Sequence, residues 1–93
     1  MNAYDSHPIY KKYNVCWNED YILGLVAFDE GLTTLAVMDA CAEAGVMTPA
    51  TTHKYIQQLL DKNLLKRIVV KYDRRMKVLA LTARGAHFLR DVK

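Results

Sequence analysis

The residues best suited to bind a polyanion are concentrated in the second half of the 93-residue chain. Residues 48–93 contain eleven Lys or Arg against three Asp or Glu, a balance of +8. Residues 1–47 contain two basic against seven acidic residues, a balance of −5, so the formal net charge of +3 conceals a marked asymmetry. Within one small domain, such asymmetry is typical of a basic face directed at a polyanion. The alternative is a charged surface that only keeps the protein in solution.

The first group of candidate binding residues lies on a predicted helix over residues 49–62. Thr48 is suited to cap this helix, and Pro49 occupies the first helical position, where its missing N–H costs nothing. Asn63 tolerates the left-handed conformation in which many helices end. Helical spacing directs four residues toward the core: Thr52, Ile56, Leu59 and Leu60. The opposite, outer face presents four others: Ala50, His53, Lys54 and Gln57.

The residue types on this outer face are those that read base edges in DNA. A glutamine can form two hydrogen bonds to adenine, a lysine can reach guanine acceptors or a phosphate, and a histidine can donate or accept. An alanine is small enough to contact a thymine methyl group. At the N-terminal end of the helix, the hydroxyls of Thr48 and Thr51 are suited to a phosphate oxygen. The alternative is a solvated helix face without a target.

The second group lies in the stretch IVVKYDRRMKVLALT, residues 68–82, where two aliphatic runs flank a charged cluster. The runs LLKRIVV and KVLAL predict two antiparallel strands, with the charged segment KYDRRM as the hairpin tip. A turn needs polar residues in any case, but mutual repulsion would destabilise so many cations around Asp73 without a partner. The cations are Lys71, Arg74, Arg75 and Lys77. We therefore expect this tip to contact DNA.

Three further predicted elements frame the two groups. Asn18 is expected to cap a first helix, and Thr33 or Thr34 a second, which precede the helix described above. Thr82 closes the second strand and caps a short C-terminal helix. The predicted fold class is α+β, mainly α, with three helices, a two-stranded β-hairpin wing and a short C-terminal helix. This order is that of a winged helix-turn-helix.

Residues 1–17 are expected to form an extended N-terminal arm, and residues 18–93 the domain, because Pro8 and the lack of a clear period argue against a helix in the arm. The arm is expected to pack against the domain or against a second copy. A homodimer would double the length of DNA that one small domain can read. The apolar surface for such an interface would come from the arm: Tyr4, Ile9, Tyr10, Tyr13 and Trp17.

The sequence lacks the patterns of an enzyme, a metal site or a membrane span. It contains no Ser/His/Asp or Cys/His arrangement, no Gly-rich phosphate loop and no HExxH motif, and its histidines form no ligand pattern. Cys16 and Cys41 form no CxxC motif and are expected to be reduced, buried thiols. No apolar run reaches about 18 residues, and the start of the chain lacks a signal peptide. We therefore expect a cytoplasmic protein without catalytic residues, metal, cofactor or membrane partner. No small-molecule effector can be identified.

Two stretches resemble the MarR-type family of winged-helix regulators, and the likeness spans about residues 32–88. TTHKYIQQLLDKNLLKR is similar to the family's recognition-helix segment. DRRMKVLALTARG is similar to its wing, where an Asp-Arg-Arg tip leads into a strand ending in Leu-Thr, with Gly three residues later. The resemblance implies that Asp73 supports the wing by pairing with an Arg and that Arg75 enters a minor groove. Short winged-helix regulators of phage and plasmid origin also resemble the segment TPATTHKYIQQLLDKNLL.

These observations predict a sequence-specific regulator of transcription that binds double-stranded DNA. Its recognition helix, residues 49–62, would lie in the major groove, and its wing, residues 71–77, at the minor groove or the backbone. The alternative is a winged-helix module that binds another protein, such as host transcription machinery, through the aromatic arm and the acidic first half.

Overall fold

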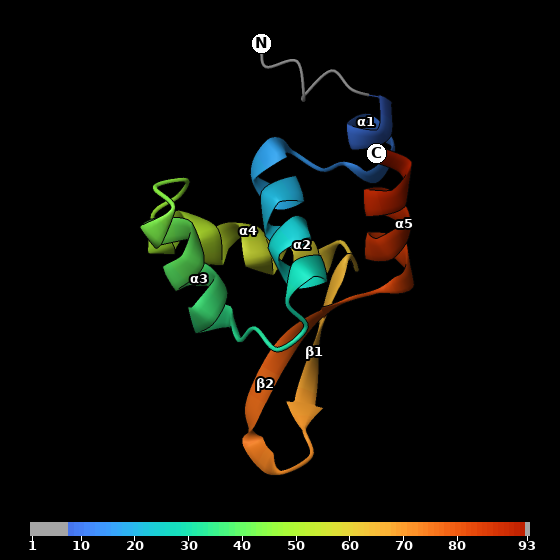
Figure 1. Ribbon diagram of the computed structural model, residues 1–93. Helices are drawn as coiled ribbons and strands as arrows, with labels where there is room; N and C mark the ends of the chain where they lie inside the picture. The colour runs from blue at the N-terminus through green and yellow to red at the C-terminus, as the bar shows by residue number, and fades with distance from the viewer. Residues whose placement is uncertain (1–7, 93) are drawn as a thin grey trace.

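The computed structural model describes residues 8–92. Four helices come first: α1 Pro8–Tyr13, α2 Trp17–Phe28, α3 Thr34–Glu43 and α4 Pro49–Asp61. The hairpin strands β1 Leu65–Val70 and β2 Asp73–Leu81 follow, and α5 Ala83–Val92 ends the described chain (Figure 1). The predicted α+β, mainly helical class is confirmed, as are the hairpin and the C-terminal helix. None of the helices among residues 8–92 has the length and apolar character to cross a membrane.

The prediction of an extended arm is wrong for residues 8–13, which form α1. Proline at the first position of a helix is tolerated, so Pro8 begins this helix instead of preventing it. Tyr10 and Tyr13 are three residues apart and therefore lie on one helix face, where both are buried against Phe88. They are not available as the intermolecular surface that was expected of the arm. Tyr4 of that predicted surface lies outside the described residues.

Helix α2 begins before Asn18, the predicted cap, because Cys16 holds the N-cap position. Glu19, three residues later, accepts a hydrogen bond from the Cys16 backbone N–H at 3.1 Å. This is one half of a capping box, in which an acidic side chain at the third helical position reaches back to the cap. Cysteine is an unusual cap, so residue type alone favoured Asn18.

The other predicted helix ends are confirmed. The hydroxyl of Thr33 accepts from the backbone N–H of Ala36 at 3.1 Å and caps α3. Thr48 caps α4, in which Pro49 is the first residue. Asn63, with φ of 62°, has the left-handed conformation expected after α4.

The hairpin has a tighter turn than predicted. Strand β2 begins at Asp73, which pairs with Val70, so only Lys71 and Tyr72 form the turn. Val69 pairs with Lys77, so β2 contains three extra residues, 74–76, in a bulge. Beyond the bulge the register is regular as far as Leu65 and Leu81. The segment predicted to be the tip is therefore mostly strand.

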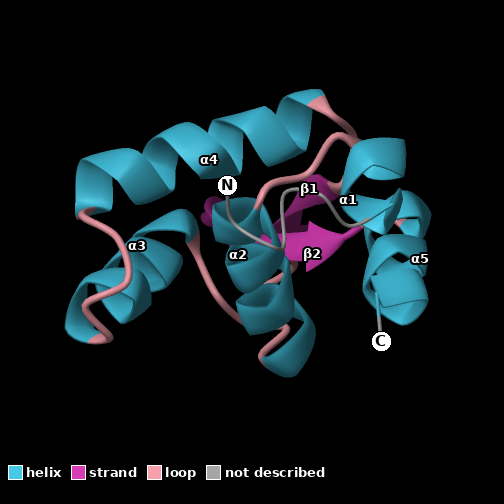
Figure 2. Cartoon of the chain, turned by 90° about the horizontal axis from the view of Figure 1, so that it is seen from above, coloured by secondary structure: helices cyan, strands magenta, loops and turns pink. Residues whose placement is uncertain are grey.

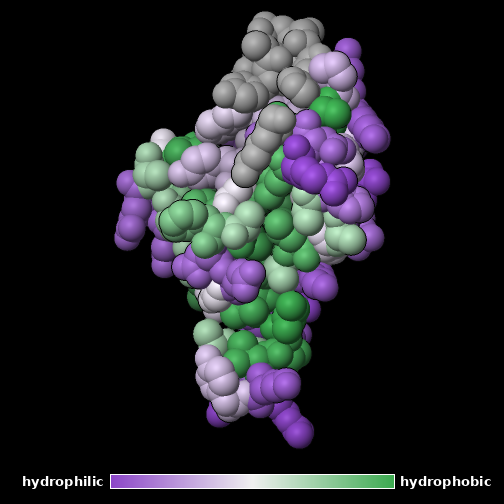
Figure 3. Space-filling view, turned by 45° about the vertical axis from the view of Figure 1, so that its right-hand side comes forward, coloured by the Kyte–Doolittle hydropathy of each residue, from purple (hydrophilic) through white to green (hydrophobic). Residues whose placement is uncertain are grey.

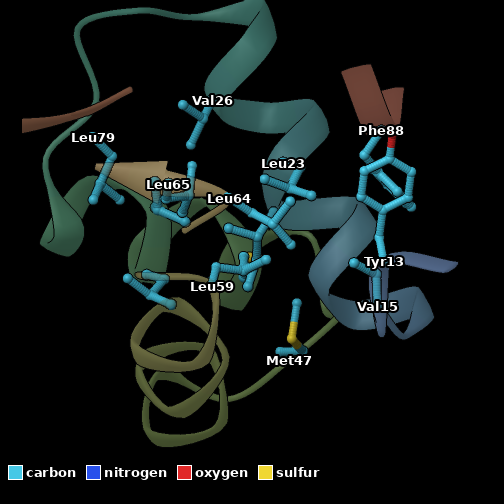
Figure 4. Close-up of a cluster of buried hydrophobic side chains, with 14 of the residues drawn as sticks. Tyr13, Val15, Leu23, Val26, Met47, Leu59, Leu64, Leu65, Leu79 and Phe88 are labelled. Carbon is cyan, nitrogen blue, oxygen red and sulfur yellow. The ribbon is translucent and has the colours of Figure 1, made fainter. Parts of the chain in front are cut away.

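A single core of apolar side chains joins all of these elements. Leu23 and Val26 from α2, Leu59 from α4, Leu64 and Leu65 at the start of β1, and Leu79 from β2 meet in its centre (Figure 4). Seen from above, α4 lies along one edge, and α1 lies beside α5 at the far end (Figure 2). The backbone N–H of Leu79 also donates to the carbonyl of Leu32 at 2.8 Å, which attaches the α2–α3 connection to the hairpin.

The junction between the hairpin and α5 requires a glycine. Thr82 caps α5 by accepting from the Gly85 backbone N–H at 3.0 Å, as predicted, and its hydroxyl donates to the Asn63 carbonyl at 2.6 Å. A Cβ atom at Gly85 would lie 2.2 Å from the carbonyl oxygen of Leu64. The Leu-Thr-x-x-Gly spacing is thus explained by the close approach of α5 to the base of β1.

Candidate nucleic-acid interface

Helix α4, the predicted recognition helix, is fixed at its C-terminal end by an ion pair with α2. The Lys62 Nζ atom lies 2.8 Å from both carboxylate oxygens of Glu19 and also donates to the backbone carbonyl of Asn14. The side chain of Glu19 is 2% exposed and that of Lys62 is 24% exposed. Because one carboxylate holds both the start of α2 and the end of α4, the two helices are set relative to each other.

The two sides of α4 are divided as the helical spacing predicts. Thr52, Ile56 and Leu59 are fully buried, and Leu60 is partly buried. On the outer side, Ala50, His53 and Lys54 are exposed, and Gln57 is half-buried. The Lys54 Nζ atom lies 5.5 Å from the centre of the Tyr55 ring, which holds the ammonium close to the helix by a cation–π contact.

The N-terminal end of α4 presents two threonines in contact with each other. The Thr48 hydroxyl accepts from the Thr51 backbone N–H at 3.3 Å and donates to the Thr51 hydroxyl oxygen at 3.0 Å. The Thr48 hydroxyl therefore uses one lone pair to cap the helix and its proton to bond Thr51. The Thr51 hydroxyl retains its own proton, which it can donate to an incoming acceptor such as a phosphate oxygen.

The hairpin brings three of the predicted residues to the first turn of α3. Asp73, Arg75 and Lys77 alternate along β2, and with Met76 they line an open recess of about 560 Å³. The opposite wall is formed by residues that the sequence did not single out for binding: Thr33, Thr34 and Leu35. Thr33 was predicted only as a cap, since its approach to the hairpin depends on the tertiary fold. Lys71, in the turn, and Arg74 do not line this recess.

Asp73 supports the turn through the backbone. Its Oδ1 atom accepts from the Arg75 N–H at 3.0 Å, which fixes the chain where the extra residues of β2 begin. The predicted wing-supporting residue therefore contacts Arg75 through the main chain.

The four cations of the wing, residues 71–77, have no acidic partner among the described residues. All four are exposed: Lys71, Arg74, Arg75 and Lys77. Within residues 8–92, ion pairs involve Lys62 and Arg90 as the basic members. The wing therefore concentrates positive charge that the fold itself does not neutralise.

The cysteines have the properties of packed thiols. Cys41 is fully buried, and Cys16 is partly buried at the start of α2. Burial raises the pKa of both thiols above the ordinary value. Because the thiolate is the nucleophile and the metal ligand, neither side chain is activated for such chemistry at neutral pH. No cluster of potential metal ligands occurs among residues 8–92.

No protein-family profile and no curated protein matches this chain. Solved structures do match. The Staphylococcus aureus MepR–DNA complex superposes with a TM-score of 0.74 and 22% identity over 90% of this chain and 66% of that chain. MarR of the same species, in complex with salicylate and kanamycin, gives 0.72 and 25% identity over 91% of this chain and 54% of that chain.

A third similar structure is S. aureus MepR bound to ethidium bromide, with a TM-score of 0.72 and 23% identity over 91% of this chain and 64% of that chain. The chain thus spans from about half to about two thirds of the length of these regulators. The protein accordingly has the winged helix-turn-helix fold of the MarR-type regulators.

Proposed function

We propose that the protein is a sequence-specific regulator of transcription that binds double-stranded DNA. The observation that carries this proposal is the set of four exposed wing cations, which lack acidic partners within the described chain. A fold shared with MepR, which has been solved in complex with DNA, supports it further. In this proposal α4 lies in the major groove, and the wing contacts the minor groove or the backbone.

Roles follow from the chemistry of each side chain. Gln57, His53 and Lys54 read base edges from the outer face of α4, and Ala50 allows close approach to the bases. Thr51 donates to a phosphate at the start of α4, beside its cap Thr48. Arg75 enters the minor groove, where a narrowed A-tract attracts a guanidinium most strongly. Further phosphate contacts come from the rest of the wing: Lys71, Arg74 and Lys77.

The recess between the wing and α3 supports a continuous path for the DNA backbone. Thr34 lies at the N-terminal end of α3, where free backbone N–H groups favour an anion. Arg75 and Lys77 form the facing wall. A phosphate seated between them would fix the wing relative to α4.

Two copies are part of the proposal, because one domain of this size reads few base pairs and two-fold copies would read a palindrome. The alternative of a protein-binding module used the aromatic arm and the acidic first half of the chain. Tyr10 and Tyr13 of that arm are buried in the core and are not available to a partner protein.

The test is selection of bound fragments from a genomic DNA library, followed by affinity measurements at several salt concentrations. We expect one enriched sequence, and a logarithm of affinity that falls linearly with the logarithm of salt. Gln57→Ala should reduce discrimination between the selected site and a mismatched site by about 1–3 kcal/mol. Lys11→Met, a change of an exposed cation on α1, is the matched control and should alter neither quantity. Absence of binding to every fragment at low salt would contradict the proposal.

A further inference from the structure

A groove between the end of α2 and the base of the hairpin is separate from the surface assigned to DNA. It has a volume of about 400 Å³. Five of its seven lining residues are apolar and two are charged: Val26, Ala27, Glu30, Lys66, Ile68, Ala80 and Leu81. No residue assigned to DNA binding is among them. Figure 3 shows apolar surface that runs from the middle of the molecule down onto the hairpin, with hydrophilic residues on both sides.

An exposed aromatic ring, that of Phe28, lies next in sequence to a residue that lines this groove. Phe28 follows Ala27 at the end of α2 and is 93% exposed, the most exposed of the large apolar residues described. Ile68, inside the groove, is 44% exposed. A phenylalanine so open to water contributes nothing to the core of this chain, and burying it elsewhere would be favourable.

The groove has an acidic residue on one wall and a basic residue on the other. Glu30 lines it from the α2 side, with Asp29 next to it, and Lys66 lines it from β1. No ion pair joins Glu30 to Lys66 within one chain. A two-fold axis places the same patch of one copy against that of the other, so that residue i meets residue j and j meets i. The acidic edge of one copy would then face the basic edge of its partner.

We propose that this surface binds a second copy of the chain, with each Phe28 ring seated in the partner's groove and each Glu30 facing the partner's Lys66. An exposed ring lies beside a groove that has apolar residues and opposite charges on its two walls. Together they provide both halves of one self-complementary contact. The outer face of α4 and the tip of the wing remain uncovered. This inference rests on the two-copy part of the proposed function, whereas DNA binding is measured separately.

The first experiment is analytical ultracentrifugation of the protein without DNA at high micromolar concentration. We expect a dimer, and Phe28→Ser should raise its dissociation constant by about 100-fold, since each of the two lost rings accounts for about tenfold. Leu35→Ser is the matched control, because Leu35 is 68% exposed on α3 and lies outside the groove. Both positions are exposed enough for the variants to fold. A wild-type monomer, or equal dissociation constants for the two variants, would overturn the inference.

The second experiment uses charge reversal. Glu30→Lys and Lys66→Glu should each weaken the dimer, because each places like charges together at both ends of the interface. An equimolar mixture of the two variants should form a heterodimer, since every cross-chain pair is then opposite in sign. A mixture that stays as monomeric as its components would refute this pairing. If these variants still bind DNA, the proposed regulator function is unaffected. If only Phe28→Ser loses DNA binding, the two copies act together on DNA.

Discussion

The end of the molecule at α1 and α5 differs from the wing in what its polar and charged groups contact. At that end the hydroxyl of Tyr13 donates to Asp91 at 3.0 Å, and the Arg84 guanidinium lies 4.9 Å from the centre of the Tyr13 ring. Lys62, at the end of α4, forms an ion pair with the buried Glu19 of α2. In the wing, four cations are exposed, and the Asp73 carboxylate accepts a hydrogen bond from the Arg75 backbone N–H. Polar groups therefore contact one another in the first region, whereas the wing cations form no ion pair within the described residues.

The end at α1 and α5 also contains a tyrosine whose pKa is shifted by its surroundings. Burial, with the hydrogen bond to Asp91 as a second cause, raises the pKa of Tyr13 above its ordinary value. The protonated hydroxyl, which is the donor in that bond, is favoured. The wing tyrosine, Tyr72, is instead 86% exposed in the turn. Variants that change one region at a time can test this division of roles.

The largest expected effect is from Lys62→Met. It leaves the Glu19 carboxylate buried without its cation, and we expect a loss of about 3 kcal/mol in the free energy of unfolding, measured by urea denaturation. Adding Glu19→Gln should recover part of this loss, because the uncompensated charge is removed. Lys11→Met, at an exposed position, should change stability by less than about 0.5 kcal/mol. If the two lysine variants lower the free energy of unfolding equally, the ion pair of Lys62 contributes no more than an exposed lysine.

A smaller loss is expected from Gly85→Ala, at the junction of the two regions. The added Cβ atom would clash with the Leu64 carbonyl oxygen, so α5 must shift from the base of β1, at a cost of about 2 kcal/mol. Gly24→Ala is the matched control, because nothing lies within 4 Å of its added Cβ atom. Alanine has the higher helix propensity, so this control should be neutral or stabilising by up to about 1 kcal/mol. Thermal unfolding of the two variants measures the contrast.

Asp73→Ala should cost about 1 kcal/mol at most, because one exposed hydrogen bond to a backbone N–H is lost. Asp73→Asn keeps an acceptor oxygen and should retain most of the stability. Amide hydrogen exchange at Arg75 should distinguish them, with faster exchange only in the alanine variant. If both variants exchange equally fast, the side chain of Asp73 does not hold the turn.

The smallest effect on stability is expected from Arg75→Ala, within about 0.5 kcal/mol, since the side chain has no partner in the described chain. Its effect on DNA should be clear nonetheless. The slope of log affinity against log salt should fall by about one unit, because one phosphate-neutralising cation is lost. An unchanged slope, with stability also unchanged, would mean that Arg75 contacts neither groove nor backbone.

Much of the frame could be predicted because its signals are local. Thr48 and Pro49 define the start of α4, Asn63 its end, and Thr82 the start of α5, each through bonds to residues a few positions away. The division of α4 into a buried and an outer face follows from helical spacing.

The features that were missed depend on contacts between distant parts of the chain. Helix α1 is held by Tyr13, whose hydroxyl bonds Asp91, 78 residues later. The pair of Glu19 and Lys62 joins residues 43 apart, so neither residue reveals its partner in the sequence. The bulge in β2 was missed because a charged segment has no apolar alternation from which a strand could be inferred. The sequence therefore predicted the local elements, such as α4 and its caps, better than the long-range contacts that hold them.

The bulge also determines where the hairpin can change in length. From Lys77 to Leu81 each residue of β2 has a fixed partner on β1, and moving this register by one residue would turn Leu79 out of the core. Residues 74–76 have no such partner, so an insertion or deletion there would alter the reach of the wing and leave the register intact. The hairpin thus combines a base of fixed register with a segment, residues 74–76, in which the length of the wing can change.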